Sequence, residues 1–240
     1  MTTIGLPHPV LASFQGAIEF IFTPQTSSVT GGEKVGGLEQ VIELTLTQLE
    51  VTFLALALAL VVALPIGLYL GHRGTGELLA IGLGNAGRAI PELALIAFMA
   101  AAIGVGLLNV TIALAILGIP PILTNAFVGI RQVDRNSVDA ARGMGMTELE
   151  VLRKVEMPLA IPTLMTGVRT ATINIVATAT IAPLAGVLTL GDFIINRNVY
   201  GDDGVLAGAI LVALLALALE FLLAGLQRLL TSRGLKVSPA

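Results

Sequence analysis

The stretch that decides the fold is LEVTFLALALALVVALPIGLYL, residues 49–70. It is an almost unbroken run of leucine, alanine and valine. A helix of about 20 residues crosses the roughly 30 Å hydrocarbon core of a bilayer, so the run is long enough to span it. A β-barrel strand would alternate apolar and polar residues over about 10 positions, whereas this run is apolar on every side. It therefore predicts a transmembrane helix.

Outward from this stretch, the same pattern recurs and predicts five transmembrane helices in all. Of the 240 residues, 55% are hydrophobic and only 12% are charged, against about 25% charged residues in a soluble domain. We therefore expect an all-α integral membrane protein. The further helices are expected at about residues 78–103, 107–128, 161–188 and 205–226.

The basic residues predict the orientation, because cytoplasmic loops are rich in lysine and arginine. If the polar segment 131–156 is cytoplasmic, nine basic residues lie on that side, and only Lys34 and Arg197 lie on the other. We expect the amino end outside and the carboxyl end in the cytoplasm. The nine are Arg73, Arg131, Arg135, Arg142, Arg153, Lys154, Arg228, Arg233 and Lys236.

This topology divides the chain into three parts. Residues 1–40 form an extracytoplasmic segment, in which the apolar stretch from Val10 to Phe22 predicts an interfacial helix. Residues 41–230 form the transmembrane domain, and residues 231–240 a cytoplasmic tail. The first 33 residues contain no lysine or arginine, which argues against a signal peptide.

The composition predicts neither a catalytic nor a metal site. There is no cysteine, which excludes disulfides and thiolate ligands, and the net charge of −3 gives no reason to expect nucleic acid. The motif GLGNAG at residues 82–87 resembles a dinucleotide fingerprint, but it lies in an apolar helical run, where small residues serve helix packing. Every aspartate, serine and histidine falls outside the predicted spans, so an intramembrane protease lacks its groups. We expect a chain that is not an enzyme.

The polar segment 131–162 reads RQVDRNSVDAARGMGMTELEVLRKVEMPLAIP. Ser137 is a suitable N-cap for a short helix that starts near Val138. Gly143 and Gly145 then interrupt that helix. The neighbouring residues Ala140–Ala141 leave a small-residue surface that a partner protein can approach closely. A solvated connecting loop is the alternative.

A second short helix is predicted directly after the glycine bend. Thr147 can cap it, and Glu150 three residues later completes a capping box. Pro158 and Pro162 are expected to limit its end. The segment thus predicts two short helices on the cytoplasmic face.

This segment also carries a family resemblance. Asp139-Ala140-Ala141, then Gly145, then Pro158 resembles the E-A-A…G…P cytoplasmic loop of ATP-binding-cassette importer permeases, with Asp in place of Glu. The resemblance covers most of residues 45–230. Among these permeases, the chain especially resembles the glycine betaine/carnitine/choline osmoprotectant family. Residues 119–146, 168–182 and 208–220 carry that finer resemblance. The segment PLAGVLTLGDF, residues 183–193, lacks the L-G-G-L-G expected there.

The resemblance implies the type I importer permease fold with a cytoplasmic coupling-helix loop at residues 131–158, in a bacterial-type inner membrane. It implies a second permease subunit, identical or different, and an external substrate-binding protein. Cytoplasmic ATPase subunits would hold ATP and magnesium, so this chain needs no cofactor. The residues implied to contact the ATPase are Asp139, Ala140, Ala141, Gly143, Gly145 and Pro158.

Two other functions remain open on the sequence. One keeps the transporter and changes the solute, for example to an amino acid. The other is a membrane scaffold or receptor that docks a cytoplasmic protein without transport.

The span at residues 161–188 is unusually polar. Four polar residues recur in it at intervals of four and therefore form one slowly drifting helical stripe. The stripe is a candidate lining for a path taken by a small polar solute. Alternatively, each hydroxyl bonds a carbonyl of its own helix or a neighbouring helix. The four residues are Thr166, Thr170, Asn174 and Thr178.

Charges within a bilayer cost about 2.5–3.5 kcal/mol each, so they require partners or water. Arg88 and Glu92 are four residues apart and are expected to pair along one helix face. Arg169 and Glu220 are expected to pair between the last two spans. The alternative is that the arginines reach the headgroups.

Overall fold

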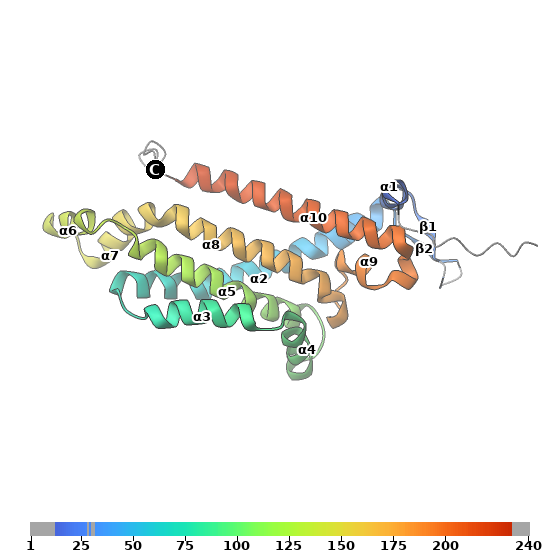
Figure 1. Ribbon diagram of the computed structural model, residues 1–240, viewed down its shortest axis with the longest axis horizontal. Helices are drawn as coiled ribbons and strands as arrows, with labels where there is room; N and C mark the ends of the chain where they lie inside the picture. Colours follow the sequence, from blue (N-terminus) through green and yellow to red (C-terminus); the bar gives the residue numbers. More distant parts are fainter. Residues whose placement is uncertain (1–12, 28, 30–31, 232–240) are drawn as a thin grey trace, which may run out of the picture.

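The structure, a computed structural model, describes residues 13–27, 29 and 32–231. Four helices are long and apolar enough to cross a membrane: α2 (Gly37–Arg73), α5 (Leu107–Arg131), a continuous run over Glu148–Ala185, and α10 (Arg197–Leu230). They lie along the long axis of the molecule (Figure 1). The all-α membrane fold predicted from the apolar runs is therefore confirmed.

The predicted helix at residues 78–103 is replaced by two shorter helices. α3 (Glu77–Ala89) and α4 (Glu92–Ile103) are separated at Ile90 and Pro91. Proline has no N–H, and its ring pushes the preceding residue towards extended geometry; Ile90 has φ −74° and ψ 121°. The predicted number of five spans was thus approximate. Among the described residues, four helices have spanning length, and α3 with α4 returns the chain from α2 to α5.

The core is centred on α5, which packs against α2, α3 and α8 (Met157–Thr178). Its fully buried side chains include Leu114 and Ile122, and Ile175 of α8 belongs to the same apolar cluster. Gly67 of α2 lies so close to α5 that an added Cβ would stand 2.6 Å from the Cβ of Ala126. Small residues therefore allow the close helix contacts that packing inside a bilayer requires.

One end of the bundle, which we name the aromatic end, consists of α1 (Phe14–Phe22), α9 (Gly191–Ile195) and the first turns of α10. Phe20, Phe193 and Tyr200 pack edge to face there, with ring centroids 4.9–6.2 Å apart. A two-stranded ribbon, β1 (Gln25–Thr26) with β2 (Lys34–Val35), lies at the same end. The aromatic end is thus a small core of its own.

The predicted amino-terminal helix is present as α1, although residues 10–12 lie outside the described part. Ser13 caps it by accepting a hydrogen bond from the Gly16 amide. Its buried face packs against α10 and α2, while Phe14 and Phe22 are exposed. An apolar face left outside the bundle fits the interfacial position expected for this helix.

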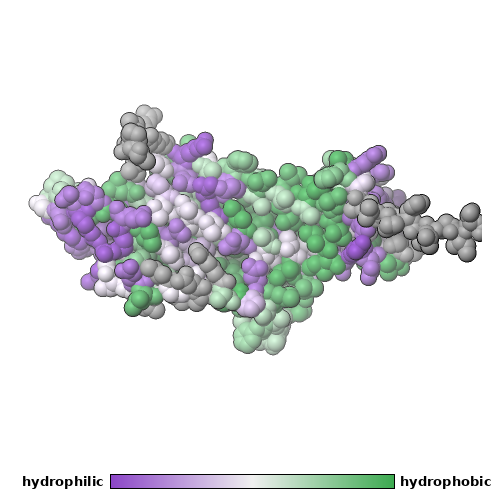
Figure 2. Space-filling view, in the orientation of Figure 1, coloured by the Kyte–Doolittle hydropathy of each residue, from purple (hydrophilic) through white to green (hydrophobic). Residues whose placement is uncertain are grey.

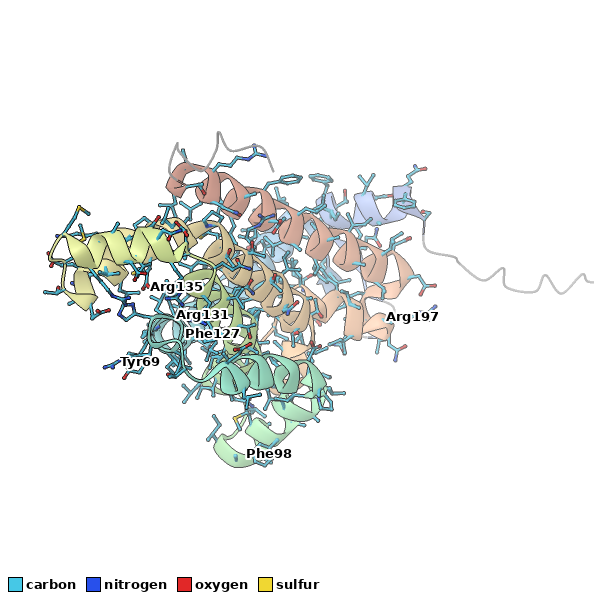
Figure 3. All side chains as sticks on the ribbon, turned by 60° about the vertical axis from the view of Figure 1, so that its left-hand side comes forward. Tyr69, Phe98, Phe127, Arg131, Arg135 and Arg197 are labelled. Atoms are coloured by element: carbon cyan, nitrogen blue, oxygen red, sulfur yellow. The ribbon has the colours of Figure 1, made fainter. Side chains whose placement is uncertain are left out.

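Hydropathy divides the visible surface into zones. Figure 2 shows hydrophobic side chains over the middle of the molecule and hydrophilic ones gathered at the end that carries α6 (Arg135–Gly143). Arg131 and Arg135 lie towards that end, whereas Arg197 lies at the opposite one (Figure 3). An apolar middle between polar ends is the distribution that a bilayer imposes.

Candidate functional site

The short helix α6 begins earlier than the sequence suggested. Asp134 caps it, because its carboxylate accepts hydrogen bonds from the amides of Asn136 and Ser137, both at 3.3 Å. The prediction of Ser137 as the N-cap is therefore wrong. Its hydroxyl instead donates to the same carboxylate at 3.2 Å. Asp and Ser are both good caps, and here the earlier one bonds the free amides.

The glycine bend and the second cap are as predicted. α6 ends at Gly143, and Gly145 has φ +86°, a conformation that favours glycine. Thr147 and Glu150 form a complete capping box at the start of α7 (Glu148–Val151). The Thr147 amide donates to the Glu150 carboxylate at 3.0 Å, and the Glu150 amide donates to the Thr147 hydroxyl at 3.4 Å.

The second helix does not end at Pro158 or Pro162, as the sequence had suggested. α7 continues through a π-helical turn, η1 (Leu152–Glu156), directly into α8. A proline in a helix removes one hydrogen bond and crowds the carbonyl four residues earlier. The wider turn lies just before Pro158 and gives that ring space. The polar segment is therefore one short helix, α6, joined to the root of a long one.

The two alanines of the predicted small-residue surface point in opposite directions. Ala140 is exposed, whereas Ala141 is buried in an apolar cluster with Val138, Val151 and Ile130. Ala141 therefore holds α6 to the bundle and is unavailable to a partner protein. Four other residues implied to contact the ATPase differ in exposure from Ala141: Asp139, Gly143 and Gly145 are exposed, and Pro158 is half-buried.

Charged side chains connect α6 to the bundle beside this cluster. Arg142 donates two hydrogen bonds to Glu148, both of 3.0 Å, and stands 3.4 Å from Asp139. These hydrogen bonds to the Glu148 carboxylate raise the pKa of the Arg142 guanidinium above its usual value. His72, in the last turn of α2, lies 3.1 Å from Glu148 and 2.5 Å from Glu156. We name α6, α7, η1 and this turn of α2 the coupling end.

Sequence reasoning missed this His72 contact. The sequence places His72 outside the predicted spans and Glu156 at the end of the polar segment 131–156. The two residues are 84 positions apart, so no helical spacing relates them. The one local signal was a carboxylate, Glu156, directly before the apolar residues of α8.

The four residues of the predicted polar stripe in α8 have different surroundings in the structure. Thr170 and Asn174 line a cavity of about 270 Å³ between α3, α5 and α8, which Glu92 also borders. The Thr166 hydroxyl bonds the Pro162 carbonyl of its own helix at 3.0 Å. Thr178 is 4% exposed and does not line the cavity. Two of the four predicted residues thus line this cavity.

The predicted charge pairs have different outcomes. Arg169 and Glu220 form an ion pair between α8 and α10, and Arg169 also donates to Gln227 at 2.7 Å. The side chain of Arg88 lies outside the described part. Its backbone belongs to α3 and Glu92 begins α4, so the two residues do not share one helix face as predicted.

Comparison with known proteins identifies the family. Residues 63–233 match the family described as binding-protein-dependent transport system inner membrane component. The glycine betaine/carnitine/choline transport system permease protein OpuCB of Bacillus subtilis (strain 168) is 38% identical over 189 residues, 78% of this chain and 87% of that protein. The carnitine transport permease protein OpuCB of Listeria monocytogenes is 39% identical over 193 residues, 80% and 88% of the two chains.

A solved structure shows the same fold at lower identity. A chain of the inward-facing MetNI methionine ABC transporter superposes with a TM-score of 0.69 at 22% identity. The match covers 81% of this chain and 98% of that one. With a matched segment that covers most of its length, this chain belongs to the family of binding-protein-dependent transport system inner membrane components.

Proposed function

We propose that this chain is the membrane permease subunit of an ATP-driven importer for quaternary ammonium osmoprotectants such as glycine betaine, carnitine and choline. The observation that carries the proposal is the similarity over about four fifths of the chain to permeases named for these solutes. A coupling end that presents a short, firmly capped helix to solvent supports it.

In this proposal the energy comes from a separate ATPase subunit, which binds ATP and magnesium. The exposed face of α6, with Asp139 and Ala140, docks on that subunit in the cytoplasm. The concentration of basic residues at the coupling end supports this orientation, with the amino end outside and the carboxyl end inside. A second permease subunit and an external binding protein complete the importer.

The cavity beside Thr170 and Asn174 is the proposed path lining. It combines hydroxyl and amide groups with the carboxylate of Glu92, and among the described residues no aromatic side chain lines it. High-affinity sites for quaternary ammonium groups use aromatic rings. The cavity is therefore suited to passing such a solute with low affinity, while the binding protein supplies recognition. The Glu92 carboxylate favours a cationic headgroup over an anion.

The test is uptake by the complete transporter, purified with its ATPase and binding protein and reconstituted in liposomes. We expect ATP-dependent uptake of glycine betaine, carnitine or choline and none of methionine. Uptake of methionine alone would refute the solute class. An intact chain that co-purifies with no ATPase would refute the importer itself and favour a scaffold.

Two variants locate the functions within the chain. Ala140→Asp places a charge on the exposed face of α6 and should prevent co-purification of the ATPase, whereas Ala140→Ser should not.

Asn174→Leu should lower uptake with the ATPase still bound. Its matched control is Thr166→Val, since the Thr166 hydroxyl bonds its own helix. Equal uptake in Asn174→Leu and the wild type would exclude this cavity from the path.

A further inference from the structure

A series of charged side chains, which we name the charge chain, runs from the exposed face of the coupling end into its interior. Its outer members are Asp139 and Arg142 of α6, and Glu148 of α7 follows with a side chain that is 62% exposed. His72 of α2 comes next, with 10% of its side chain exposed. The innermost member is Glu156, which is 1% exposed. The charge chain thus extends from solvent to a fully enclosed carboxylate.

His72 contacts two carboxylates, Glu148 of α7 and Glu156 of η1, and it is the member of the charge chain that belongs to α2. Its Nε2 lies 3.1 Å from Glu148, and its Nδ1 lies 2.5 Å from Glu156. In the imidazolium form both ring nitrogens donate hydrogen bonds, so one side chain serves both carboxylates. A carboxylate enclosed in protein requires such a partner, which explains why Glu156 faces this ring.

The position of Glu156 gives the contact its meaning. It is the last residue of η1, the π-helical turn from which α8 starts. α8 carries Thr170 and Asn174, which line the cavity, and α2 packs against both α5 and α8. One end of the charge chain is therefore on the helix that docks the ATPase, and the other is at the root of the helix that lines the path.

We propose that His72 is a positioning residue for energy coupling. It ties α2 to the root of α8 and, through Glu148 and Arg142, to α6, so that a displacement of α6 by the ATPase moves these helices together. The inference rests on the proposed function, since it concerns how ATP turnover reaches the solute path. Without the tie, α6 remains attached through Val138 and Ala141, but its motion is transmitted poorly.

The experiment measures solute imported per ATP hydrolysed by the reconstituted transporter. His72→Gln keeps a polar side chain of similar size, but its N–H donors are on one nitrogen instead of on two separate ring nitrogens. We expect the ratio of solute to ATP to fall about tenfold, within the range typical of coupling between sites, while the ATPase still co-purifies. Arg73→Gln is the matched control, because that neighbouring arginine lies over the Tyr69 ring instead. It should keep the wild-type ratio.

A second variant separates coupling from folding. His72→Gln alone leaves Glu156 buried without its partner, which destabilises a protein more than removing both members of a pair. The double variant His72→Gln/Glu156→Gln contains no unpaired charge at this position. It should regain assembly and thermal stability, and it should still import about tenfold less solute per ATP. A purely structural role predicts recovery of all three.

A third variant changes the outer carboxylate, which contacts both Arg142 and His72. Glu148→Gln changes a side chain that is largely exposed, so the fold should tolerate it. We expect a smaller loss in solute per ATP than with His72→Gln.

Several outcomes would overturn the inference. These are a wild-type ratio of solute to ATP in His72→Gln or in the double variant, an equal loss in Arg73→Gln, or a double variant that does not assemble. Uptake by the wild-type transporter is measured first. If it imports none of the three osmoprotectants, the proposed function is refuted. If it imports them and His72→Gln has the same ratio of solute to ATP, only the role of His72 is refuted.

Discussion

The coupling end and the aromatic end hold the same bundle together by different interactions. At the coupling end, α6 is attached by a few small apolar side chains and by the charges around His72. At the aromatic end, three rings meet edge to face. Asp192, which is 5% exposed, accepts hydrogen bonds from Tyr200 at 2.5 Å and Asn196 at 2.6 Å.

The difference indicates a division of mechanical roles. Close-packed rings occupy one arrangement, and their contacts weaken as soon as they separate. Exposed ion pairs contribute little stability, and salt screens them, so the outer pairs at Arg142 can exchange partners at low cost. The aromatic end is suited to remain fixed, and the coupling end is suited to move.

The largest expected effect is at the aromatic end. Phe193→Ala removes a fully buried ring from the three-ring cluster and should lower the free energy of unfolding by about 3–5 kcal/mol. Denaturant titration in mild detergent measures it. Phe22→Ala, on the exposed face of α1, is the control and should change little. Equal losses would mean that the ring cluster is not the anchor of this end.

At the coupling end, Ala141→Asp should cost slightly less, about 3 kcal/mol, because it places an unpaired carboxylate in the apolar cluster under α6. Ala140→Asp, one residue earlier and exposed, should leave stability unchanged. Thermal unfolding of the purified chain without its ATPase distinguishes the two variants. Similar unfolding temperatures would contradict the opposite directions of these alanines.

A smaller effect is expected for Tyr200→Phe. It keeps the ring and removes the hydroxyl that donates to Asp192, and a buried carboxylate that loses such a donor costs about 2 kcal/mol. Tyr69→Phe, at an exposed ring, is the matched control in the same denaturant titration. No difference between them would show that the rings alone stabilise the aromatic end.

The smallest effect is expected for Thr147→Ala. It removes the hydroxyl half of the capping box and should destabilise the start of α7 by about 1 kcal/mol. Hydrogen exchange of the Glu150 amide reports this locally. Glu150→Gln preserves the capping box, since glutamine also serves there, and should leave that amide protected. A protected amide in Thr147→Ala would show that α7 needs no cap.

What the sequence predicted correctly was local or compositional. The apolar runs predicted the spanning helices, and the spacing of Thr147 and Glu150 predicted their capping box. The pair of Arg169 with Glu220 was also expected, because each charge needed a partner at a similar depth. In each of these cases a single physical rule applied, and the residues that it related lay within a few positions in the sequence or at the same depth in the bilayer.

The errors arose where two rules competed. Asp134 and Ser137 are both good caps, and the earlier one forms the cap. Pro91 ends a helix, whereas Pro158 lies inside one, and the difference depends on the π turn beside Pro158. The contact of His72 with Glu156 joins separate helices, and the one local signal, a carboxylate directly before the apolar residues of α8, does not identify its partner.

The π turn has one further consequence, which concerns rotation. Such a turn holds one residue more than an α turn, and one residue of an α-helix corresponds to about 100° of rotation about its axis. If η1 tightened to an ordinary α turn, everything beyond Glu156 would revolve by about that angle relative to α7. The side chains of α8 would then face different neighbours along the whole helix. A local change at this one turn would therefore change which face α8 presents along its whole length.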